Sequence, residues 1–425
     1  MPPVLGIDFG TTNTVLALLH PDGTTTTARF GTQEVFRSVL CFWAENYGSG
    51  TAQGSRLRQE AGPAAIEAYL DDPLDSRLIM SMKTYLAQRS FTDTRIFGRR
   101  FTLEALIATF LRSFLAAAQV DPAGLRIIAG RPVRFAGERT DDDFGETRLR
   151  AAFAEAGMVG IDVALEPEGA GYRFARTLTA PATVLIGDFG GGTSDFSLLR
   201  FVPGQGVEPL GHSGVGIAGD VFDYRIIDQV ISPRLGKGMT YRVMGGAELP
   251  VPPDWYSSFA RWHRLSLMRN PKTLREMREV MRGARDPHRL GNLVDLIEDE
   301  MGYRLYQTVS AAKAALSDSA TTRLSFHHKE LGLDIAITRA DFEAWIAADL
   351  AQFAAAIDQV MRQSGVTAVD HVFLTGGTSF VPAVRRLFDD RFGAARVSTG
   401  GEFVSVAEGL ALIGRDRAAG FASHG

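Results

Sequence analysis

The apolar residues of the chain first show the spacing of buried strands. Apolar runs at 4–7 and 184–186 each lead into Asp-Phe-Gly, a short polar turn and a second apolar run. Because short apolar runs bounded by glycine are typical of buried strands, they predict β-hairpins at about 4–18 and 184–199. A third run, Val372–Leu374, predicts a strand followed by a Gly-Gly turn, after which Pro382 can begin a helix.

Other stretches show helical spacing. After Thr102, apolar residues up to Leu115 recur every three or four positions, which predicts a helix capped by the Thr102 hydroxyl. Thr338 and Asp341 have the spacing of a capping box, with aspartate in place of the usual glutamate or glutamine. The apolar residues that follow, through Val360, predict a long helix there.

The turn of the second hairpin carries the first candidate chemistry. Three consecutive glycines at 190–192 lie between Asp188 and Asp195, with Thr193 beside them. Glycine allows the backbone to turn tightly, and the freed amides suit phosphate oxygens, while the two carboxylates can hold the accompanying cation. Such a turn is equally common as a plain structural turn, so this pattern alone leaves both interpretations open.

A second copy of the pattern favours the ligand-binding interpretation. The first hairpin repeats Asp8-Phe9-Gly10 before the hydroxyl-rich turn residues Thr11, Thr12 and Asn13. An internal repeat about 180 residues apart indicates two related lobes that present their turns to a shared cleft. The third turn, at Gly376, Gly377 and Thr378, offers amides to a sugar, base or phosphate. Together the three turns predict a nucleotide polyphosphate site with a metal ion.

Composition narrows the functional classes. The 425 residues are 45% apolar, which favours two domains, and Lys+Arg 45 against Asp+Glu 49 gives a net charge of -4. This charge offers no basic field for nucleic acid, and no apolar run approaches the length of a membrane span. The single cysteine, Cys41, lies in an apolar run and is expected to be a buried thiol. We expect a cytoplasmic protein without nucleic-acid or membrane partners, and a monomer is favoured although the oligomeric state stays open.

Taken together, the two hairpins, the GGTSFVP turn and the ITRADFE segment at 335–343 resemble the ATPase domain of the heat-shock-70 (DnaK-type) chaperones. This family belongs to the actin and sugar-kinase superfamily. Gly130-Arg131-Pro132 and the loop 211–214 are similar in particular to short bacterial members. The likeness spans about residues 4–414 and fades near 232–300. It implies an α/β, actin-like ATPase fold, with two lobes of duplicated ribonuclease-H-like domains around a central nucleotide cleft.

The resemblance also implies roles for individual residues. Asp8 and Asp188 would hold hydrated Mg²⁺, and Thr193 with Asp195 would bind a monovalent cation such as K⁺. Lys83 and Glu166 would place the attacking water, and Pro132 would belong to a switch between nucleotide state and lobe rotation. As structure alone, Lys83 and Glu166 would be ordinary surface side chains. The phosphates and adenosine of ATP or ADP would be bound by Gly10, Thr11, Thr12, Asn13, Gly190, Gly191, Gly192, Gly216, Lys313, Ser317, Gly376, Gly377, Thr378 and Phe380.

The chain departs from the family pattern around the base. Ala314 stands where the family has an arginine that stacks on adenine, Ser310 replaces an acidic residue, and Phe380 replaces a second arginine. Either Phe380 stacks on the adenine instead, or base affinity and selectivity are lower. The stretch near 232–300 mixes aromatic, basic and acidic residues, and we interpret it as a lid-like insertion. Dependence on the usual nucleotide-exchange factors is therefore open.

The predicted division of the chain follows the repeat. Lobe I would span 1–182 and lobe II 183–414, with an enlarged lid-like region at about 225–320 and a short tail at 415–425. From the resemblance we expect this sequence to contain no peptide-binding domain of the kind found in a full chaperone.

Function is predicted accordingly as Mg²⁺-dependent ATP binding with slow hydrolysis to ADP and phosphate. The protein would act as a DnaK-like chaperone or nucleotide-driven switch with protein partners not yet known. Two alternatives remain, a small-molecule kinase of the sugar-kinase type and an actin-like filament or interaction protein, because this fold supports all three activities.

Overall fold

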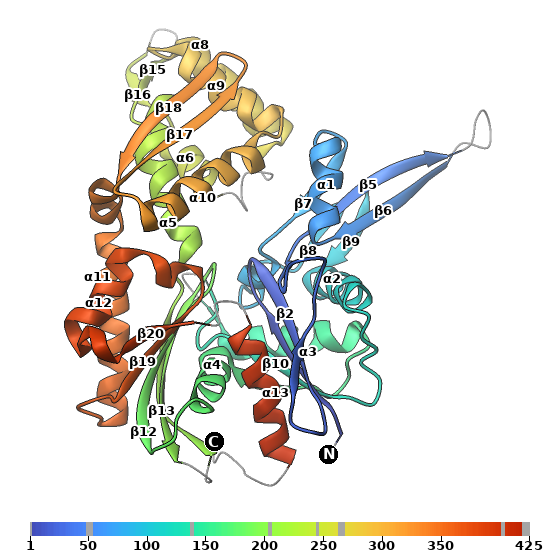
Figure 1. Cartoon of the computed structure of the whole chain (residues 1–425). Helices are drawn as coiled ribbons and strands as arrows, with labels where there is room; N and C mark the ends of the chain where they lie inside the picture. Colours follow the sequence, from blue (N-terminus) through green and yellow to red (C-terminus); the bar gives the residue numbers. More distant parts are fainter. Residues whose placement is uncertain are drawn as a thin grey trace. The chain divides into compact units, whose positions relative to one another are not determined.

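The computed structural model describes residues 2–47, 54–136, 140–202, 206–243, 246–261, 268–400 and 404–418. Contacts group the chain into two compact units, one formed by 1–219 with 350–425 and one by 220–349. The first unit contains the helices and strands β1 (Val4–Phe9), β2 (Asn13–Leu19), β3 (Thr25–Thr27), β4 (Phe36–Arg37), β5 (Leu40–Tyr47), β6 (Gly54–Ala61), α1 (Pro63–Asp71), β7 (Ser76–Ile79), η2 (Met82–Tyr85), β8 (Asp93–Ile96), β9 (Arg99–Thr102), α2 (Leu103–Ala117), β10 (Arg126–Arg131), α3 (Asp142–Glu155), β11 (Asp162–Leu165), α4 (Glu166–Ala175), β12 (Ala182–Phe189), β13 (Ser194–Val202), β14 (Gly206–Val215), β19 (His371–Thr375), η5 (Gly377–Phe380), α12 (Pro382–Phe392), η6 (Ala394–Arg396), β20 (Val397–Thr399) and α13 (Ser405–Ala418) (Figure 1).

Two sheets of the first unit share one topology. One sheet has the order β11-β10-β1-β2-β3, and the other has the order β20-β19-β12-β13-β14. In each, the first hairpin is antiparallel and continues antiparallel to a third strand, while the two strands on the other side pair in parallel. The same order and direction of five strands confirm the duplication predicted from the two Asp-Phe-Gly hairpins. The fold is α/β and agrees with the predicted actin-like ATPase fold.

Two helices pack between these sheets. Helix α13 contacts β1, β2 and β10 of one sheet, helix α4 contacts β12 and β13 of the other, and the two helices contact each other extensively. Glycines permit this close approach, because a methyl group on Gly409 would lie 1.6 Å from the Gly169 carbonyl oxygen. A methyl group on Gly6 of β1 would lie 2.1 Å from the Ala407 carbonyl oxygen. The inner layers of the unit therefore depend on glycine at these helix and strand positions.

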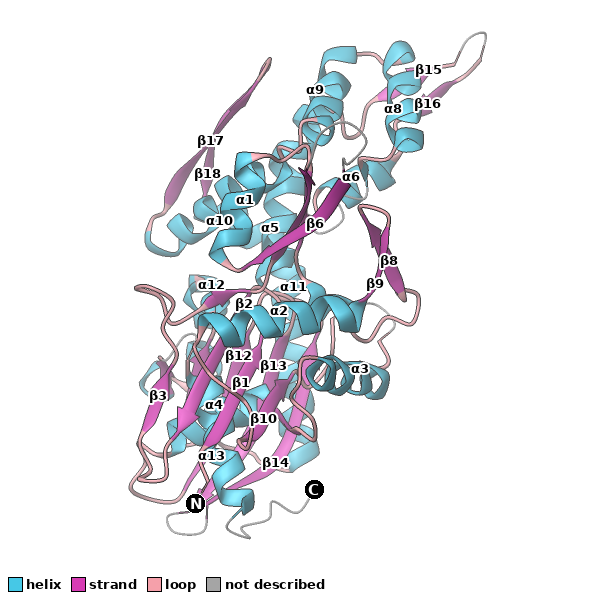
Figure 2. Cartoon of the chain, turned by 90° about the vertical axis from the view of Figure 1, so that its right-hand side faces the viewer, coloured by secondary structure: helices cyan, strands magenta, loops and turns pink. Residues whose placement is uncertain are grey.

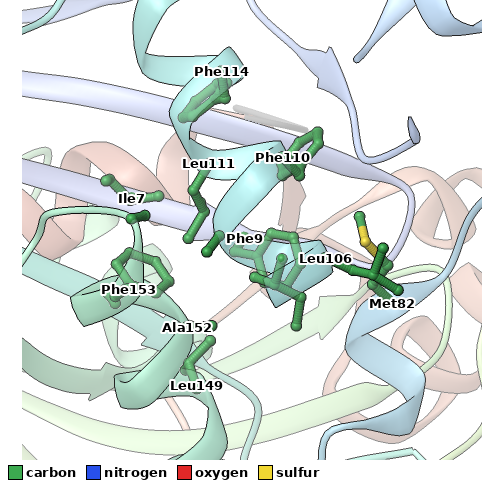
Figure 3. Close-up of a cluster of buried hydrophobic side chains, with 14 of the residues drawn as sticks. Ile7, Phe9, Met82, Leu106, Phe110, Leu111, Phe114, Leu149, Ala152 and Phe153 are labelled. Atoms are coloured by element: carbon green, nitrogen blue, oxygen red, sulfur yellow. The ribbon is translucent and has the colours of Figure 1, made fainter. Parts of the chain in front are cut away.

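The outer face of each sheet is also covered. Apolar side chains of β1 pack against helices α2 and α3, where Ile7 and Phe9 meet Phe110, Leu111 and Phe153 (Figure 3). Thr102 caps α2 as predicted, because its side chain accepts a hydrogen bond from the Ala105 amide at 3.1 Å. On the other sheet, Phe189 and Phe196 contact aromatic rings of helices α11 (Arg339–Ser364) and α12. Figure 2 shows the strands of both sheets with these helices around them.

The second unit has its own core and ion pairs. Its elements are α5 (Gly219–Ile226), η3 (Ile227–Ile231), η4 (Ser232–Leu235), β15 (Thr240–Arg242), β16 (Glu248–Pro250), α6 (Pro253–Phe259), α8 (Pro271–Gly283), α9 (Pro287–Glu298), α10 (Gly302–Asp318), β17 (Thr321–His328), β18 (Leu331–Thr338) and the first part of α11. Asp349 is 1% exposed, and its two carboxylate oxygens accept hydrogen bonds from Nε and Nη2 of Arg225, each at 2.9 Å. Within the predicted lid-like stretch, Tyr256 and Phe259 are buried, whereas Trp262 lies outside the described residues. Long-range pairing thus supports this unit in addition to apolar burial.

Several local predictions are confirmed. Helix α12 begins at Pro382, and Thr338 accepts a hydrogen bond from the Asp341 amide at 3.1 Å at the start of α11. Cys41 is buried. No helix in the described ranges is long and apolar enough to cross a membrane. The predicted lobe boundary at 182/183 falls inside the first compact unit and stays a prediction.

The glycine contact between α4 and α13 yields a stability prediction. Replacing Gly409 with alanine forces the new methyl group against the Gly169 backbone, so we expect the free energy of unfolding to fall by about 1–3 kcal/mol. Gly291→Ala in α9 is the control, because its methyl group would meet only Met281 Sδ at 3.7 Å and alanine favours a helix by roughly 0.5–1 kcal/mol. Thermal unfolding measures both. Equal melting temperatures for the two variants would contradict the packing described.

Candidate functional site

Contacts within the turn itself make each of the first two predicted turns, at 10–13 and 190–193, tight. At Gly10, a methyl group would lie 2.2 Å from the Asn13 carbonyl oxygen, so the turn between β1 and β2 requires glycine there. In the turn between β12 and β13, the Gly190 amide donates to the Thr193 carbonyl at 2.9 Å. Each turn therefore closes on itself just after the next-to-last residue of its first strand, which is Asp8 in β1 and Asp188 in β12.

The structure brings the three turns together. A methyl group on Gly192 would lie 3.2 Å from Thr11 Oγ1, so the turns of the two related hairpins lie side by side. The third turn joins them at Gly376, which has φ 86° and would place a methyl group 2.1 Å from the Phe189 carbonyl oxygen. This contact sets the third turn against the end of β12. Residues far apart in the sequence thus form one group of glycine-rich turns within the first unit.

A buried ion pair lies beside these turns. Lys83, on the short helix η2, donates from Nζ to Glu166 Oε1 at 2.5 Å, and each side chain is 7% exposed. Glu166 is the first residue of α4 and lies over Gly130 of β10, where a methyl group would be 2.9 Å from Glu166 Cγ. Glu166 and Pro167 therefore belong to the first turn of this helix. Neither side chain is an ordinary surface group.

The carboxylates near this pair have strongly perturbed pKa values. Burial, with repulsion from Glu166, raises the pKa of Asp8 to about 7, and Lys83 lowers it in part. Burial and the charges of Glu166, Asp8 and Asp195 raise the pKa of Asp188 well above its ordinary value. Burial also tends to lower the pKa of Lys83, but attraction to Glu166, Asp8 and Asp188 outweighs it and raises the value. Negative charge is therefore in excess at this site.

This charge arrangement fits a hydrated divalent cation. Asp8 and Asp188 keep part of their surface accessible, so a ligand can reach them. In the part of the chain that the structure describes, no three acidic, histidine or cysteine side chains are grouped to enclose a metal ion by themselves. Mg²⁺ usually keeps several waters and takes one or two carboxylates together with substrate phosphates. The residues present fit that mode of binding rather than an all-protein cage.

Asp195 differs from the other two aspartates because the chain itself holds it. Its side chain is 1% exposed, and Oδ1 accepts hydrogen bonds from the Val133 amide at 3.0 Å and the Arg134 amide at 3.3 Å. Burial and Glu166 raise its pKa to about 7, while hydrogen bonds from Thr193 and Arg134 act in the opposite direction. Its predicted role as a cation ligand stays a prediction.

The predicted adenosine residues are distributed over both units. Gly376, Gly377 and Thr378 belong to the first unit, and Phe380 at the end of η5 is 43% exposed there. Gly216 follows strand β14. Lys313 and Ser317 lie on α10 in the second unit, where Lys313 Nζ pairs with the buried Asp223 at 2.9 Å. Asp223 thus neutralises the charge of the Lys313 ammonium. The sequence pattern did not reveal this ion pair.

Sequence reasoning missed several side chains and amides at the site. Arg37 donates from Nη1 to Asn13 Oδ1 at 3.1 Å and so brings positive charge to the first turn. The amides of Val133 and Arg134 hold Asp195 across more than 60 residues of sequence. No local pattern marks these contacts. Asn13 of β2 and Arg37 of β4 lie opposite each other in the sheet, and this proximity follows only from the register of the two strands.

The raised pKa values give a prediction for the protein without nucleotide or Mg²⁺. Asp8 titrates near 7 in the folded chain, against an ordinary value of 3.8, so the folded state binds more protons between these values. Stability from this group is present below about pH 4 and is lost as the pH rises through 7. Asp8→Asn removes this loss of stability at high pH, because asparagine does not ionise. We expect its melting temperature to exceed that of the wild type at pH 8, with a difference that shrinks towards pH 5.

Asp75→Asn, at an exposed position, is the matched control for this prediction and should show no such dependence on pH. Differential scanning calorimetry at several pH values measures all three proteins. If the melting temperatures of Asp8→Asn and the wild type differ by the same amount at pH 5 and pH 8, the pKa of Asp8 is not raised in the folded chain as described.

Comparison with known proteins shows which family shares these features. A family model described as "Hsp70 protein" matches residues 281–415. The chaperone protein DnaK of Thermotoga petrophila is 26% identical over 402 residues, which cover 92% of this chain and 55% of that protein. DnaK proteins of Thermotoga neapolitana and Deinococcus proteolyticus are 25% and 23% identical, over 92% of this chain and 55% and 56% of their own lengths. The chain thus spans about half the length of the curated relatives it matches. These matches, together with the duplicated sheets and their glycine-rich turns, show that the chain is similar to proteins of the Hsp70 family.

Proposed function

We propose that the chain binds ATP with Mg²⁺ at the paired glycine-rich turns and hydrolyses it slowly. The observation that carries this proposal is the meeting of the turns at Thr11 and Gly192 beside an excess of carboxylate charge. Backbone amides at two tight turns suit phosphate oxygens, and the carboxylates suit the cation that accompanies them. When bound, Mg²⁺ would neutralise developing phosphate charge.

The chain's own residues would supply the remaining functions. Asp8 and Asp188 would hold the waters of the metal ion, while Thr11, Thr12, Asn13, Gly10 and the turn 190–193 would cradle phosphates. Lys83 would place positive charge near the terminal phosphate, and Glu166 would orient the attacking water. The ion pair between them fixes both side chains in one position before the substrate arrives. Gly216, Lys313, Ser317, Gly376, Gly377, Thr378 and Phe380 remain the candidates for adenosine, and Asp195 with Thr193 the candidates for K⁺.

A DnaK-like role is the biological function that this activity supports best. The relatives are named chaperone protein DnaK, and this chain matches about half of their length. We therefore propose a nucleotide-driven switch in the cytoplasm that acts on protein partners. The described residues offer no specific observation in favour of a sugar-type kinase or a filament, and ATP turnover stimulated by sugars or ATP-dependent pelleting would indicate these instead.

Nucleotide binding is tested directly by calorimetric titration of ATP and ADP with Mg²⁺ into the wild type and Asp188→Ala. We expect tight binding by the wild type and binding at least about tenfold weaker in the variant, because each lost charge-assisted contact costs roughly 1.5–3 kcal/mol. Asp75→Ala, at an exposed position on the loop after α1, should bind like the wild type. Absence of heat with the wild type would reject the proposed function.

Hydrolysis depends on a different residue. Glu166→Gln keeps the shape of the side chain and an acceptor for Lys83 but removes the carboxylate that would orient water. We expect phosphate release to slow by about 10²–10⁴-fold, while the dissociation constant for ATP changes by only a few fold.

Glu168→Gln is the matched control, because it removes a second carboxylate from the first turn of the same helix. Single-turnover measurement of phosphate release compares the two variants. Equal rates for Glu166→Gln and the wild type would exclude Glu166 from the chemical step.

A further inference from the structure

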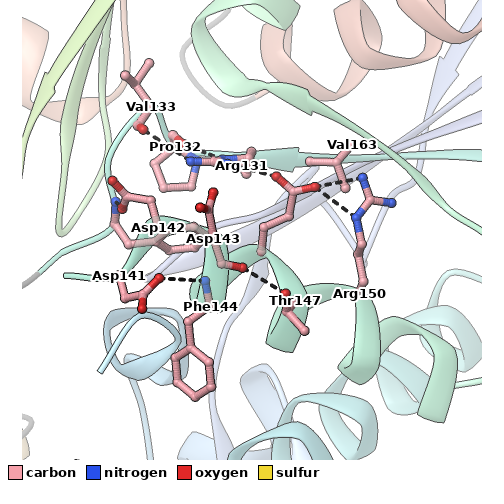
Figure 4. A network of polar contacts seen from close by, with 12 residues as sticks. Arg131, Pro132, Val133, Asp141, Asp142, Asp143, Phe144, Thr147, Arg150 and Val163 are labelled. Carbon is pink, nitrogen blue, oxygen red and sulfur yellow. Dashed lines mark hydrogen bonds and ion pairs between the residues drawn. The ribbon is translucent and has the colours of Figure 1, made fainter. Parts of the chain in front are cut away.

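The turn that follows strand β10 has an arginine on one side and an aspartate on the other. Arg131 ends β10, and its guanidinium donates from Nε to the Pro132 carbonyl at 3.0 Å and from Nη2 to the Val133 carbonyl at 3.3 Å (Figure 4). On the other side, Asp195 Oδ1 accepts from the Val133 amide at 3.0 Å and the Arg134 amide at 3.3 Å.

These four hydrogen bonds involve only two peptide groups. The Pro132 carbonyl and the Val133 amide belong to one peptide bond, and the Val133 carbonyl and the Arg134 amide belong to the next. In a planar trans peptide, C=O and N–H point in opposite directions. A guanidinium that holds both carbonyls therefore turns both amides towards the opposite side, where the Asp195 carboxylate lies.

The charges are arranged in favourable order. The positive guanidinium faces the negative ends of the two peptide dipoles, and the negative carboxylate faces their positive ends. Hydrogen bonds in such a chain polarise one another and strengthen where the dielectric is low. Asp195 is 1% exposed and the Arg131 side chain 15% exposed, so both ends are largely shielded from water.

Helix α3 holds the arginine in this orientation. Glu146 of α3 accepts from Arg131 Nη1 at 2.8 Å, and the guanidinium lies over the Phe135 ring at 5.4 Å. Glu146 also accepts from Arg150 Nε at 2.9 Å, but Arg150 makes its other contact to the Ile161 carbonyl and does not touch the turn. Arg150 is therefore a natural control for the loss of a guanidinium from the same network.

The bridge joins the two related sheets. Arg131 ends a strand of the first sheet, and Asp195 lies on β13 of the second, where its side chain is also hydrogen-bonded to Thr193. Thr193 is part of the glycine-rich turn between β12 and β13. A displacement of the Arg131 side chain would thus reach that turn through two peptide groups and one carboxylate.

We propose that Arg131 is a positioning residue, which holds the Asp195 carboxylate and the turn beside it through the peptide groups 132–133 and 133–134. The consequence for catalysis rests on the proposed ATPase function, whereas the bridge itself exists in the protein without nucleotide. The existence of the bridge and its effect on catalysis can therefore be tested separately.

The bridge is tested by NMR hydrogen exchange of individual amides in the protein without nucleotide. In Arg131→Met, hydrogen exchange of the Val133 and Arg134 amides should accelerate about tenfold. The reason is that the loss of a charge-assisted hydrogen bond changes the equilibrium between closed and open amides by at least about that factor. Arg131→Lys should lie between this variant and the wild type, because an ammonium cannot bind both carbonyls in the same fork geometry. Arg150→Met should leave both amides unchanged.

A purely structural role predicts a different pattern. It would accelerate exchange throughout β10 and α3, whereas the positioning role confines the change to these two amides. Unchanged exchange in Arg131→Met, or an equal increase in Arg150→Met, would overturn the proposal. If Arg131→Met does not fold, Asp195→Ala removes the bridge from its other end and should release the same two amides.

Phosphate release and ATP binding measure the consequence for function. We expect Arg131→Met to slow release about tenfold with a smaller change in ATP affinity, and Arg150→Met to behave like the wild type. Normal turnover in Arg131→Met despite released amides would overturn the positioning role. If the wild type itself binds no ATP, the proposed function fails, and the exchange rates still decide whether the bridge exists.

Discussion

The site depends on the charge balance around Lys83. Its ammonium pairs with Glu166 and attracts Asp8 and Asp188, yet the carboxylates outnumber it, and burial raises the pKa values of Asp8 and Asp188. Taking charges out of water is unfavourable unless they are paired. The folded chain therefore keeps an excess of negative charge, which a bound cation would offset. This excess of carboxylate charge, rather than any single glycine-rich turn, is the feature of the site that favours binding of a cation.

The scaffold around this charge is a duplicated sheet whose two copies end at one place. The same five-strand topology presents Asp8 and Asp188 at equivalent positions, each the next-to-last residue of the first strand of a hairpin. Helices α4 and α13 fill the space between the sheets, and glycine contacts such as Gly409 with Gly169 let them approach closely. Glu166 stands at the first residue of α4, so the packing of that helix also sets the position of the ion pair.

The sequence predicted what local patterns determine. The hairpins, the Thr102 cap and the start of α12 at Pro382 follow from spacing and from residues next to one another in the chain. Lys83 and Glu166 lie 83 positions apart, and Arg225 and Asp349 lie 124 apart, so no local pattern shows that they pair. Lys83 and Glu166 were named through the family resemblance alone, and the contacts of Arg131 and Arg37 were missed. The grouping of residues 220–349 as a compact unit likewise depends on long-range contacts that follow only from folding.

Under the proposed function, the paired turns and their carboxylates together bind the phosphates of a nucleotide with Mg²⁺. A crystal structure with Mg²⁺ and a non-hydrolysable ATP analogue tests it most directly. We expect phosphate oxygens in contact with amides of both the 10–13 and the 190–193 turns, and a metal ion whose waters reach Asp8 and Asp188. A nucleotide bound elsewhere, or phosphates that touch one turn alone, would contradict it.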